Sequence, residues 1–497
     1  MYSISDITSI LTAQEKQQFI RYLKKKNKKH SIKNITFFEL LNQGKKEKEI
    51  ETLLYKKSEK AAYHALRKRL KDALLDFIAI TNFESETSEE FDILKLLLCS
   101  RIFFEQRNYS LAFNLLKKAE LKAMELDQYG LLNEIYYTKI QHINYDARLN
   151  LQEVLLQYKS NKSKLTQEEN LNIFRATLEY QLNHYVDDLR ATVDQAMVQS
   201  EIYINEKLTI RSSYKLLELL NTIGHHQRNY HHLLPLFEEI YQQIIFKKEL
   251  QNKNQFYHIQ IFYLLANANF RTRNFIKASE FLEAMYSTIE SKNSKYAQRF
   301  FPQYTLLKAL VLNYTGNAIA AIKLLSDFPY HKHKNQQSYI LDLKLSLVVF
   351  YVQQQELQKA MKLIQTFNRS DNWYQEKAGI TWVLKKNITT MLIYLDKENI
   401  DLFESTYKSF TKKYINYLKQ NKEVRTLEFL KLISAYYKDP LTINSQDFKT
   451  RVNNTLTTKN KNIEDVFEMS IYAWLKAKIN RTDLYSTTLE LVAHKKR

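Results

Sequence analysis

The sequence predicts an all-α protein built from repeated pairs of helices. Glycine and proline are very scarce, with 5 and 4 among 497 residues, so the chain lacks the turn residues that strand-rich folds need. A chain of this length also exceeds one ordinary globular core unless it forms a repeat array. Finally, a short pattern of a turn, an aromatic or apolar residue and then a small residue recurs along most of the chain.

The clearest copy of this pattern covers residues 256–290. Its apolar spacing predicts two amphipathic helices joined by a tight turn at Thr272-Arg273-Asn274. Small residues stand where the two helices must touch, namely Ala266, Ala268, Ala278 and Ala284. This copy therefore sets the register for the rest of the array.

Weaker copies place the second helix of each pair at a spacing of roughly 40 residues. The predicted starts, after the one at Tyr109, lie near residues 150, 187, 230, 275, 318, 357, 400, 443 and 482. The short polar stretches 159–164 and 459–462 are expected to be loops between repeats.

Residues 1–90 differ from this pattern and are expected to form a basic N-terminal helical region, with the repeats covering residues 91–497. Helices are predicted over residues 13–27, 36–42, 46–55 and 58–80. The acidic stretch Asn82–Glu90 is expected to be a linker.

The repeats resemble the tetratricopeptide repeat (TPR) superfamily. In that family an aromatic residue opens the second helix and small residues follow, as Tyr109 precedes Ala112 and Ala119, and Phe275 precedes Ala278. The units here are longer than the family's usual repeat and lack its closing proline. The segments LTAQEKQQFIRYLKKK and YHALRKRLKDALLDFI are similar to N-termini of bacterial TPR-like proteins.

The resemblance implies a right-handed α-α superhelical solenoid of about nine or ten helix pairs, with the N-terminal region as a helical cap. It further implies that the first helix of each pair lines a concave groove for a peptide or protein partner. Asparagine can bind a peptide backbone and arginine can pair with carboxylates. The candidate groove residues are Arg101, His225, His226, Tyr263, Asn267, Arg271, Asn313 and Tyr314. The alternative is that these are ordinary polar residues of solvated helix faces.

The net charge of +20 indicates attraction to polyanions, or else lysines that simply fill solvated helix faces. The N-terminal helices could imitate a helix-turn-helix that meets phosphates, or could form a capping bundle. The candidate polyanion-binding residues are Lys24, Lys25, Lys26, Lys28, Lys29, Arg67, Lys68 and Lys71.

No catalytic or cofactor motif is found, so we expect neither an enzyme nor a cofactor. No metal site is expected either: the histidines at 225, 226, 231 and 232 are interpreted as polar turn and groove residues, and His331 and His333 as solvated. Cys99 lies in an apolar run and is expected to be a buried thiol.

The N-terminus does not resemble a secretory signal and no apolar run approaches the ~20 residues of a membrane helix, so a cytoplasmic location is expected, without membrane contact. The first hypothesis is a non-enzymatic scaffold that binds a peptide or protein in a concave groove. The alternative is a nucleic-acid-associated regulator with a basic N-terminal region and a partner-sensing solenoid. The sequence leaves the oligomeric state open.

Overall fold

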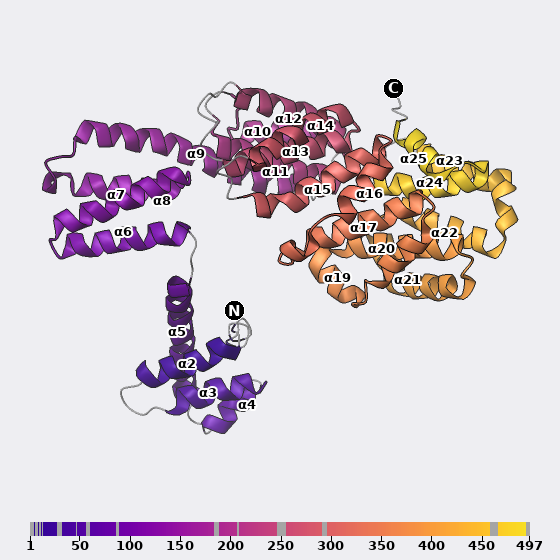
Figure 1. Ribbon diagram of the computed structural model, residues 1–497. Helices are drawn as coiled ribbons and strands as arrows, with labels where there is room; N and C mark the ends of the chain where they lie inside the picture. The colour runs from indigo at the N-terminus through magenta and orange to yellow at the C-terminus, as the bar shows by residue number, and fades with distance from the viewer. Residues whose placement is uncertain are drawn as a thin grey trace. The chain divides into compact units, whose positions relative to one another are not determined.

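A computed structural model gives the architecture of the chain. It describes residues 4, 8, 11, 13–26, 32–45, 47–55, 60–85, 89–182, 188–205, 208–245, 255–290, 296–457 and 466–493. Every regular element in these ranges is a helix, so the predicted all-α class is confirmed (Figure 1). Within the same ranges, no helix is both long enough and apolar enough to cross a membrane.

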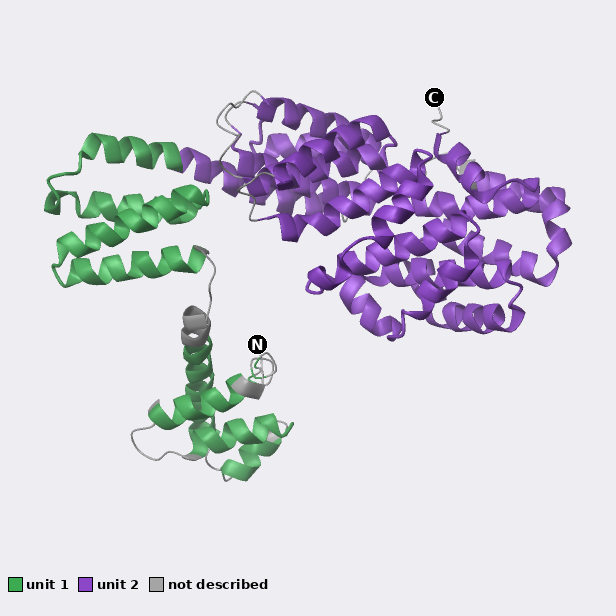
Figure 2. Cartoon of the chain, in the orientation of Figure 1, with its two compact units in different colours: residues 1–161 green, residues 162–497 purple. Residues whose placement is uncertain are grey.

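The chain divides into two compact units, residues 1–161 and residues 162–497 (Figure 2). The boundary expected near residue 90 lies inside the first unit and stays a prediction. Helix α9 (Leu151–Leu182) begins in the first unit and ends in the second. The other helices of the first unit are α2 (Ala13–Lys26), α3 (Ile32–Asn42), α4 (Glu47–Leu54), α5 (Lys60–Ser85), α6 (Glu89–Glu105), α7 (Tyr109–Glu125), α8 (Tyr129–Gln141) and the 3-10 turn η1 (Ile143–Tyr145).

The second unit follows with shorter helices, most of them in consecutive pairs. They are α10 (Leu189–Gln199), α11 (Ile210–Gln227), α12 (Tyr230–Ile245), α13 (Gln255–Arg271), α14 (Phe275–Glu290), α15 (Ala297–Tyr314), α16 (Ala318–Ser326), η3 (Tyr330–His333), α17 (Gln337–Gln353), α18 (Leu357–Gln365), α19 (Asp371–Ala378), α20 (Ile380–Asp396), α21 (Ile400–Gln420), α22 (Val424–Lys438), η4 (Pro440–Asn444), α23 (Gln446–Thr457), α24 (Val466–Asn480) and α25 (Leu484–Ala493).

The predicted helix starts agree closely with these bounds. From α10 onward, the predicted starts correspond to helices that begin at residues 189, 230, 275, 318, 357, 400, 446 and 484. The small residues also lie where expected, because Ala266, Ala268 and Ala278 are fully buried between helices. Their size lets α13 and α14 approach closely.

The turn between paired helices has a repeated conformation. Arg228, Arg273, Gln355 and Glu398 have φ between +50° and +61°, and Gly316 has φ of +94°. A residue with left-handed backbone conformation ends each of these first helices. The N–H of the following residue then donates a hydrogen bond to a carbonyl in the last turn of the helix; for example, the N–H of residue 274 donates to the carbonyl of residue 269 at 2.8 Å. Such a conformation costs a non-glycine residue about 1 kcal/mol, which this closing hydrogen bond offsets. The turn therefore gives these five pairs the same internal register.

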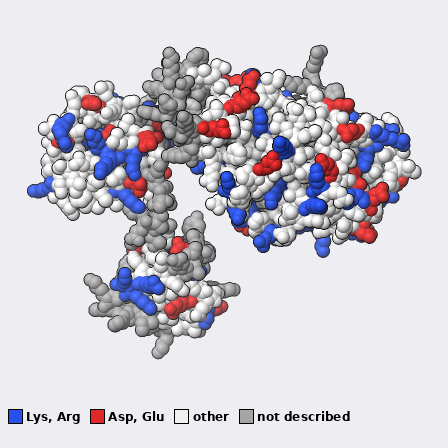
Figure 3. Space-filling view, viewed as in Figure 1, with Lys and Arg blue, Asp and Glu red and all other residues white. Residues whose placement is uncertain are grey.

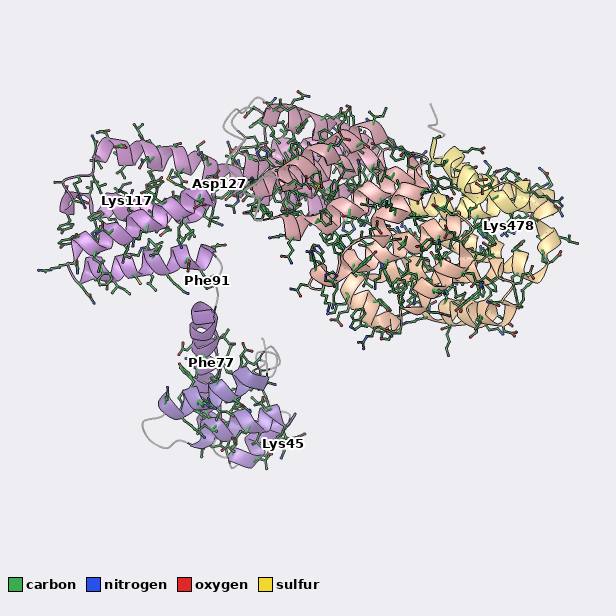
Figure 4. The ribbon with its side chains drawn as sticks, viewed as in Figure 1. Lys45, Phe77, Phe91, Lys117, Asp127 and Lys478 are labelled. Atoms are coloured by element: carbon green, nitrogen blue, oxygen red, sulfur yellow. The ribbon has the colours of Figure 1, made fainter. Side chains whose placement is uncertain are left out.

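The N-terminal helices α2–α5 pack around a core of large apolar side chains. Phe19 contacts Phe38 and Phe77, with ring centroids 4.7 and 5.2 Å apart (Phe77 is labelled in Figure 4). The expected linker Asn82–Glu90 was too long, because α5 continues to Ser85 and α6 begins at Glu89. No glycine or proline interrupts this acidic stretch, so nothing in it prevents the helix from continuing.

A second expected loop is also wrong. Residues 159–164 lie in the middle of α9, a helix of 32 residues. This polar stretch has no helix breaker, and its Asn161 is buried, with its side-chain Nδ2 donating to the carbonyl of Tyr129 at 2.9 Å. The other expected loop, residues 459–462, lies outside the described residues.

Cys99 is exposed, so the prediction of a buried thiol is wrong. The apolar run of α6 covers more than one face of the helix. Ile93, Leu97 and Phe104 follow helical spacing and are buried, whereas Leu98 and Cys99 lie on the opposite face. The apolar run has no periodicity, so it did not show which side of the helix is buried.

His333 is buried, contrary to its expected solvated position, whereas His331 is exposed. The ring of His333 lies 5.2 Å from that of Phe328 and 6.1 Å from that of Phe301. Burial lowers the pKa of His333. The local sequence YHKH is polar, and only the fold of the loop onto two phenylalanines buries this side chain.

Candidate functional site

In five pairs of the second unit the first helix ends at a left-handed turn residue. Counting back along the chain from that residue identifies equivalent positions on the five helices. Two places before that residue, in the last turn of α11, α13, α15, α17 and α20, stand His226, Arg271, Tyr314, Gln353 and Asp396. Six places before it stand Thr222, Asn267, Leu310, Val349 and Leu392, and ten places before it stand Glu218, Tyr263, Leu306, Leu345 and Ile388. We call these three rows the inner rows.

On α15, α17 and α20 the last-turn row faces α24. Ser470 Oγ lies 3.1 Å from Tyr314 Oη and accepts a hydrogen bond from Gln353 Nε2 at 3.0 Å. Asp396 accepts a hydrogen bond from Trp474 Nε1 at 2.8 Å and pairs with Lys478 at 2.8 Å (Lys478 is labelled in Figure 4). The α24 residues 470, 474 and 478 are four positions apart and so share one face of that helix.

The hairpin of α24 and α25 thus covers the inner rows of α15, α17 and α20. In the rows six and ten places before the turn residue the covered positions are apolar, and Leu345, Ile388 and Leu392 are buried in the same core as Trp474. Helix α24 is buried almost all round, as expected for a helix enclosed by others. It is therefore a structural core helix of this unit.

The inner rows become polar on α11 and α13. Here Glu218 is exposed, and Thr222, Tyr263 and Asn267 are half-buried at positions that carry leucine, isoleucine or valine in the covered repeats. We call this surface the open inner face; its residues are Glu218, Asn221, Thr222, His226, Tyr263, Asn267 and Arg271. The first turn of α24 nevertheless reaches these helices, because its Glu468 pairs with the turn residue Arg228 at 3.0 Å and its Met469 shares a core with Phe270 of α13.

A hydrogen-bonded asparagine pair lies at the centre of this face. Asn267 Nδ2 donates to Asn221 Oδ1 at 2.8 Å, and Tyr230 Oη donates to the backbone carbonyl and Oδ1 of Asn221 at 3.0 and 3.1 Å. These bonds fix both amides. Among the described residues, Asn221 Nδ2 and Asn267 Oδ1 have no partner. The pair therefore presents one donor and one acceptor.

Gly224 makes this arrangement possible. A Cβ atom at this position would lie 3.0 Å from the ring of Tyr230. Only glycine lets the tyrosine ring lie flat against the last turns of α11, with its hydroxyl on Asn221. The glycine thus acts through close packing here and not through its φ angle.

A second polar group lies beside Tyr263, on α15 and α17. Gln303 Nε2 donates to Tyr339 Oη, and Gln303 Oε1 is buried without a partner in the described part of the chain. Burial raises the pKa of Asp342 to about 6, and Lys385 partly opposes this rise. Burial also raises the pKa of both tyrosines, and the charge of Asp342 contributes to each rise. These three side chains therefore interact electrostatically.

Among the residues that the structure describes, Arg271 has no counter-ion. Its Nε is buried without a hydrogen-bond partner, and no carboxylate among the described residues pairs with it. Its charge lowers the pKa of Tyr263, which lies eight positions earlier on the same helix. A guanidinium in this state presents donors that no group of the described protein satisfies.

The predicted groove residues are partly brought together. His226, Tyr263, Asn267 and Arg271 share the open inner face, with His225 exposed beside His226. Two further predicted residues lie under the hairpin: Asn313 is fully buried, with Nδ2 donating to Gln353 at 2.8 Å, and Tyr314 lies next to it. Arg101 is in the other unit, where it pairs with Glu134 at 2.6 Å.

The predicted polyanion-binding residues are more scattered. Lys24, Lys25 and Lys68 are exposed and Lys71 is half-buried. Arg67 pairs with Glu47 at 2.7 Å. Figure 3 shows lysines and arginines interspersed with acidic residues on the visible face. The side chain of Lys26, and Lys28 and Lys29 altogether, lie outside the described residues.

Metal-ligating side chains do not gather in the ranges that the structure describes, where no group of three or more His, Cys, Asp or Glu is placed to hold an ion. His232 instead lies 3.2 Å from Asn229 through its Nδ1.

Sequence reasoning missed Asn221, Gln303 and Asp342. The signal that finds them is the turn register, which aligns each first helix with the next. Comparison with known proteins adds no assignment: no family model matches the chain, and no curated protein sequence matches it.

Proposed function

We propose that this protein is a non-enzymatic scaffold that binds a peptide segment of a partner protein on the open inner face. The observation that carries the proposal is the asparagine pair, which presents Asn221 Nδ2 and Asn267 Oδ1 without partners. An extended peptide needs one acceptor for an N–H and one donor for a carbonyl at each contact. The pair supplies both, already oriented by Tyr230.

Preorganisation strengthens this argument. A side chain that must be immobilised on binding costs about 0.5–1.5 kcal/mol, which reduces affinity. Asn221 and Asn267 are already held by hydrogen bonds of 2.8–3.1 Å, so less of that cost remains. Arg271 lies in the same face and can receive a carboxylate of the partner through a charge-assisted hydrogen bond.

The proposal includes the architecture that the TPR resemblance implies. It is a right-handed superhelix of about nine or ten helix pairs, acting in the cytoplasm, with the N-terminal helices as a cap. The repeated turn and the matching helix starts support this interpretation.

Crosslinking from the open inner face tests the proposed function. A photoreactive residue in place of Thr222, in the full-length chain in its native cell, should crosslink to a protein that copurifies with the chain. Asn267→Ala should reduce that yield at least about tenfold, while Tyr230 keeps Asn221 fixed. Asn335→Ala, at an exposed position of the same unit, serves as the matched control. Equal yields from the wild type and Asn267→Ala would contradict the proposal.

A second candidate is a nucleic-acid-associated regulator, favoured by the exposed Lys24, Lys25 and Lys68 and the charge of +20. Its affinity for DNA or RNA should fall steeply with salt, because each phosphate contact releases a counter-ion. Absence of binding to duplex DNA and to single-stranded RNA at 50 mM salt removes this candidate.

A further inference from the structure

Arg228 joins an early helix of the second unit to two late ones. It is the left-handed residue that ends α11, and its Nη2 donates to both carboxylate oxygens of Glu423 at 2.8 and 2.9 Å. Its Nη1 donates to Glu468 at 3.0 Å. Glu423 directly precedes α22 and Glu468 lies in the first turn of α24, so the contacts span 195 and 240 positions of sequence.

A second arginine completes a cluster of four charges. Arg425, in the first turn of α22, lies 3.5 Å from the other carboxylate oxygen of Glu468. Tyr472 of α24 donates from its Oη to the backbone carbonyl of Arg425 at 2.8 Å. Glu468 is buried, and a guanidinium beside each of its oxygens compensates its charge there. We call Arg228, Glu423, Arg425 and Glu468 the closure cluster.

The closure cluster connects helices that are not neighbours in the array. In stacked helix pairs each pair contacts its neighbours, and small rotations between them add up to the curvature of the whole. The apolar core that contains α11 and α12 includes residues of α13 but none of α22 or α24. Among the described residues, α11 therefore meets α22 and α24 through charged side chains. The cluster closes the curve without belonging to its apolar packing.

We propose that the closure cluster is a latch that opens and closes the second unit and so controls access to the open inner face. The Arg228 side chain is 43% exposed and that of Glu423 is 21% exposed. Dissolved salt therefore screens their attraction, as it does for other ion pairs in contact with water. When the cluster breaks, the helix pairs between α11 and α22 keep their packing and the array relaxes to a wider curve.

The latch lies at the edge of the open inner face. Arg228 follows His226 of that face by two positions, and Met469 in the first turn of α24 shares a core with Phe270, which directly precedes Arg271. The first turn of α24 therefore borders the last turns of α11 and α13 and limits access to that end of the face. Opening the latch separates this turn from α11. The effect on binding rests on the proposed function, whereas the opening itself does not.

Electron–electron double resonance between two spin labels measures the opening. In the full-length chain, Cys99→Ser removes the single native thiol, and Gln242→Cys on α12 and Gln420→Cys on α21 carry the labels at exposed positions. Raising the salt from 0.1 to 1 M shortens the Debye length from about 10 to about 3 Å, so the fraction of molecules with the longer label distance should rise at least about threefold. Identical distance distributions at both salt concentrations overturn the latch.

Charge variants assign the opening to the closure cluster. Arg228→Gln should give the high-salt distribution already at 0.1 M salt, and Glu423→Gln should shift the distances in the same direction. Lys277→Gln is the matched control, because it removes a similarly exposed cation whose ion pair with Glu238, at 2.5 Å, joins the second helices of consecutive pairs. It should leave the distances unchanged. An equal shift in Lys277→Gln would mean a general loosening and would overturn the assignment.

Partner crosslinking from Thr222 tests the effect on access. Apparent affinity is proportional to the fraction of molecules in the binding-competent state, so Arg228→Gln should raise the crosslinking yield at 0.1 M salt at least about threefold. Lys277→Gln should not change it. Equal yields from the wild type and Arg228→Gln would overturn the control of access. Absence of crosslinking in every chain, the wild type included, would instead contradict the scaffold function, and the label distances would still decide whether the latch exists.

Discussion

The Asp342→Asn substitution should make the second unit more stable at neutral pH, because it removes a negative charge from a half-buried position. Burial raises the pKa of Asp342 from its ordinary value of 3.8 to about 6. The folded state therefore holds this proton more tightly than the unfolded chain does. Consequently the free energy of unfolding falls as the pH rises from about 4 to about 6, and it stays lower above that range.

The expected magnitude follows from the same two values. The difference between 3.8 and about 6 corresponds to about 3 kcal/mol at pH 7.5, since each pKa unit is worth about 1.4 kcal/mol. Asparagine has nearly the same shape and no charge, so it avoids this cost. At pH 4.5 the folded wild type keeps its proton, and the gain in the variant should shrink to about 1 kcal/mol.

Urea denaturation measured at pH 4.5, 6.0 and 7.5 provides the assay. The three tryptophans, Trp373, Trp382 and Trp474, all lie in the second unit, so their fluorescence reports the unfolding of that unit alone. Asp327→Asn is the matched control and should change the free energy of unfolding by less than about 0.5 kcal/mol at each pH. A variant that is less stable than the wild type at pH 7.5, or whose gain does not change with pH, would refute the reasoning.

Two further substitutions test the packing on which the inner rows depend. Ser470→Ala leaves the buried Nε2 of Gln353 without its acceptor and should cost about 1–3 kcal/mol, with faster amide hydrogen exchange in α24; unchanged exchange there would mean that this bond does not hold the helix. Gly224→Ala brings a methyl group within 3.0 Å of the Tyr230 ring and should cost about 1–3 kcal/mol in urea denaturation and weaken partner crosslinking. Gly130→Ala, with no atom within 4 Å of the added carbon, is its control and should be neutral or stabilising by up to about 1 kcal/mol.

Local signals explain why so much of the fold could be predicted from the sequence. The turn at Asn274 and the small residue Ala278 act within a few residues, so they place helix starts correctly along the second unit. Where the local signal is only polarity, prediction failed, as at residues 159–164 inside α9. Cys99 failed because an apolar run does not identify the buried face. Each error arose where tertiary packing, and not propensity, decides the outcome.

The candidate site was predictable only in part for the same reason. Tyr263, Asn267 and Arg271 belong to one helix of one repeat, so the local sequence is enough to place them on the same face. Helix α24 covers Tyr314 and Asn313 through contacts between residues as far apart as 314 and 470. Such contacts cannot be predicted from the local sequence. The sequence of α24, VFEMSIYAWLKAKIN, does carry a usable signal, because large apolar residues around most of a helix indicate that it is enclosed.

The hairpin that covers the inner rows also sets an order of events during synthesis. Gln353 and its partner Ser470 are 117 residues apart, so the ribosome adds the covering helix on the order of ten seconds after the surface that it covers. During that interval Leu345, Ile388 and Leu392 have no α24 against which to pack. The nascent array therefore carries an unfinished apolar channel, and a ribosome that stalls before residue 466 leaves a product that we expect chaperones to hold and proteases to remove.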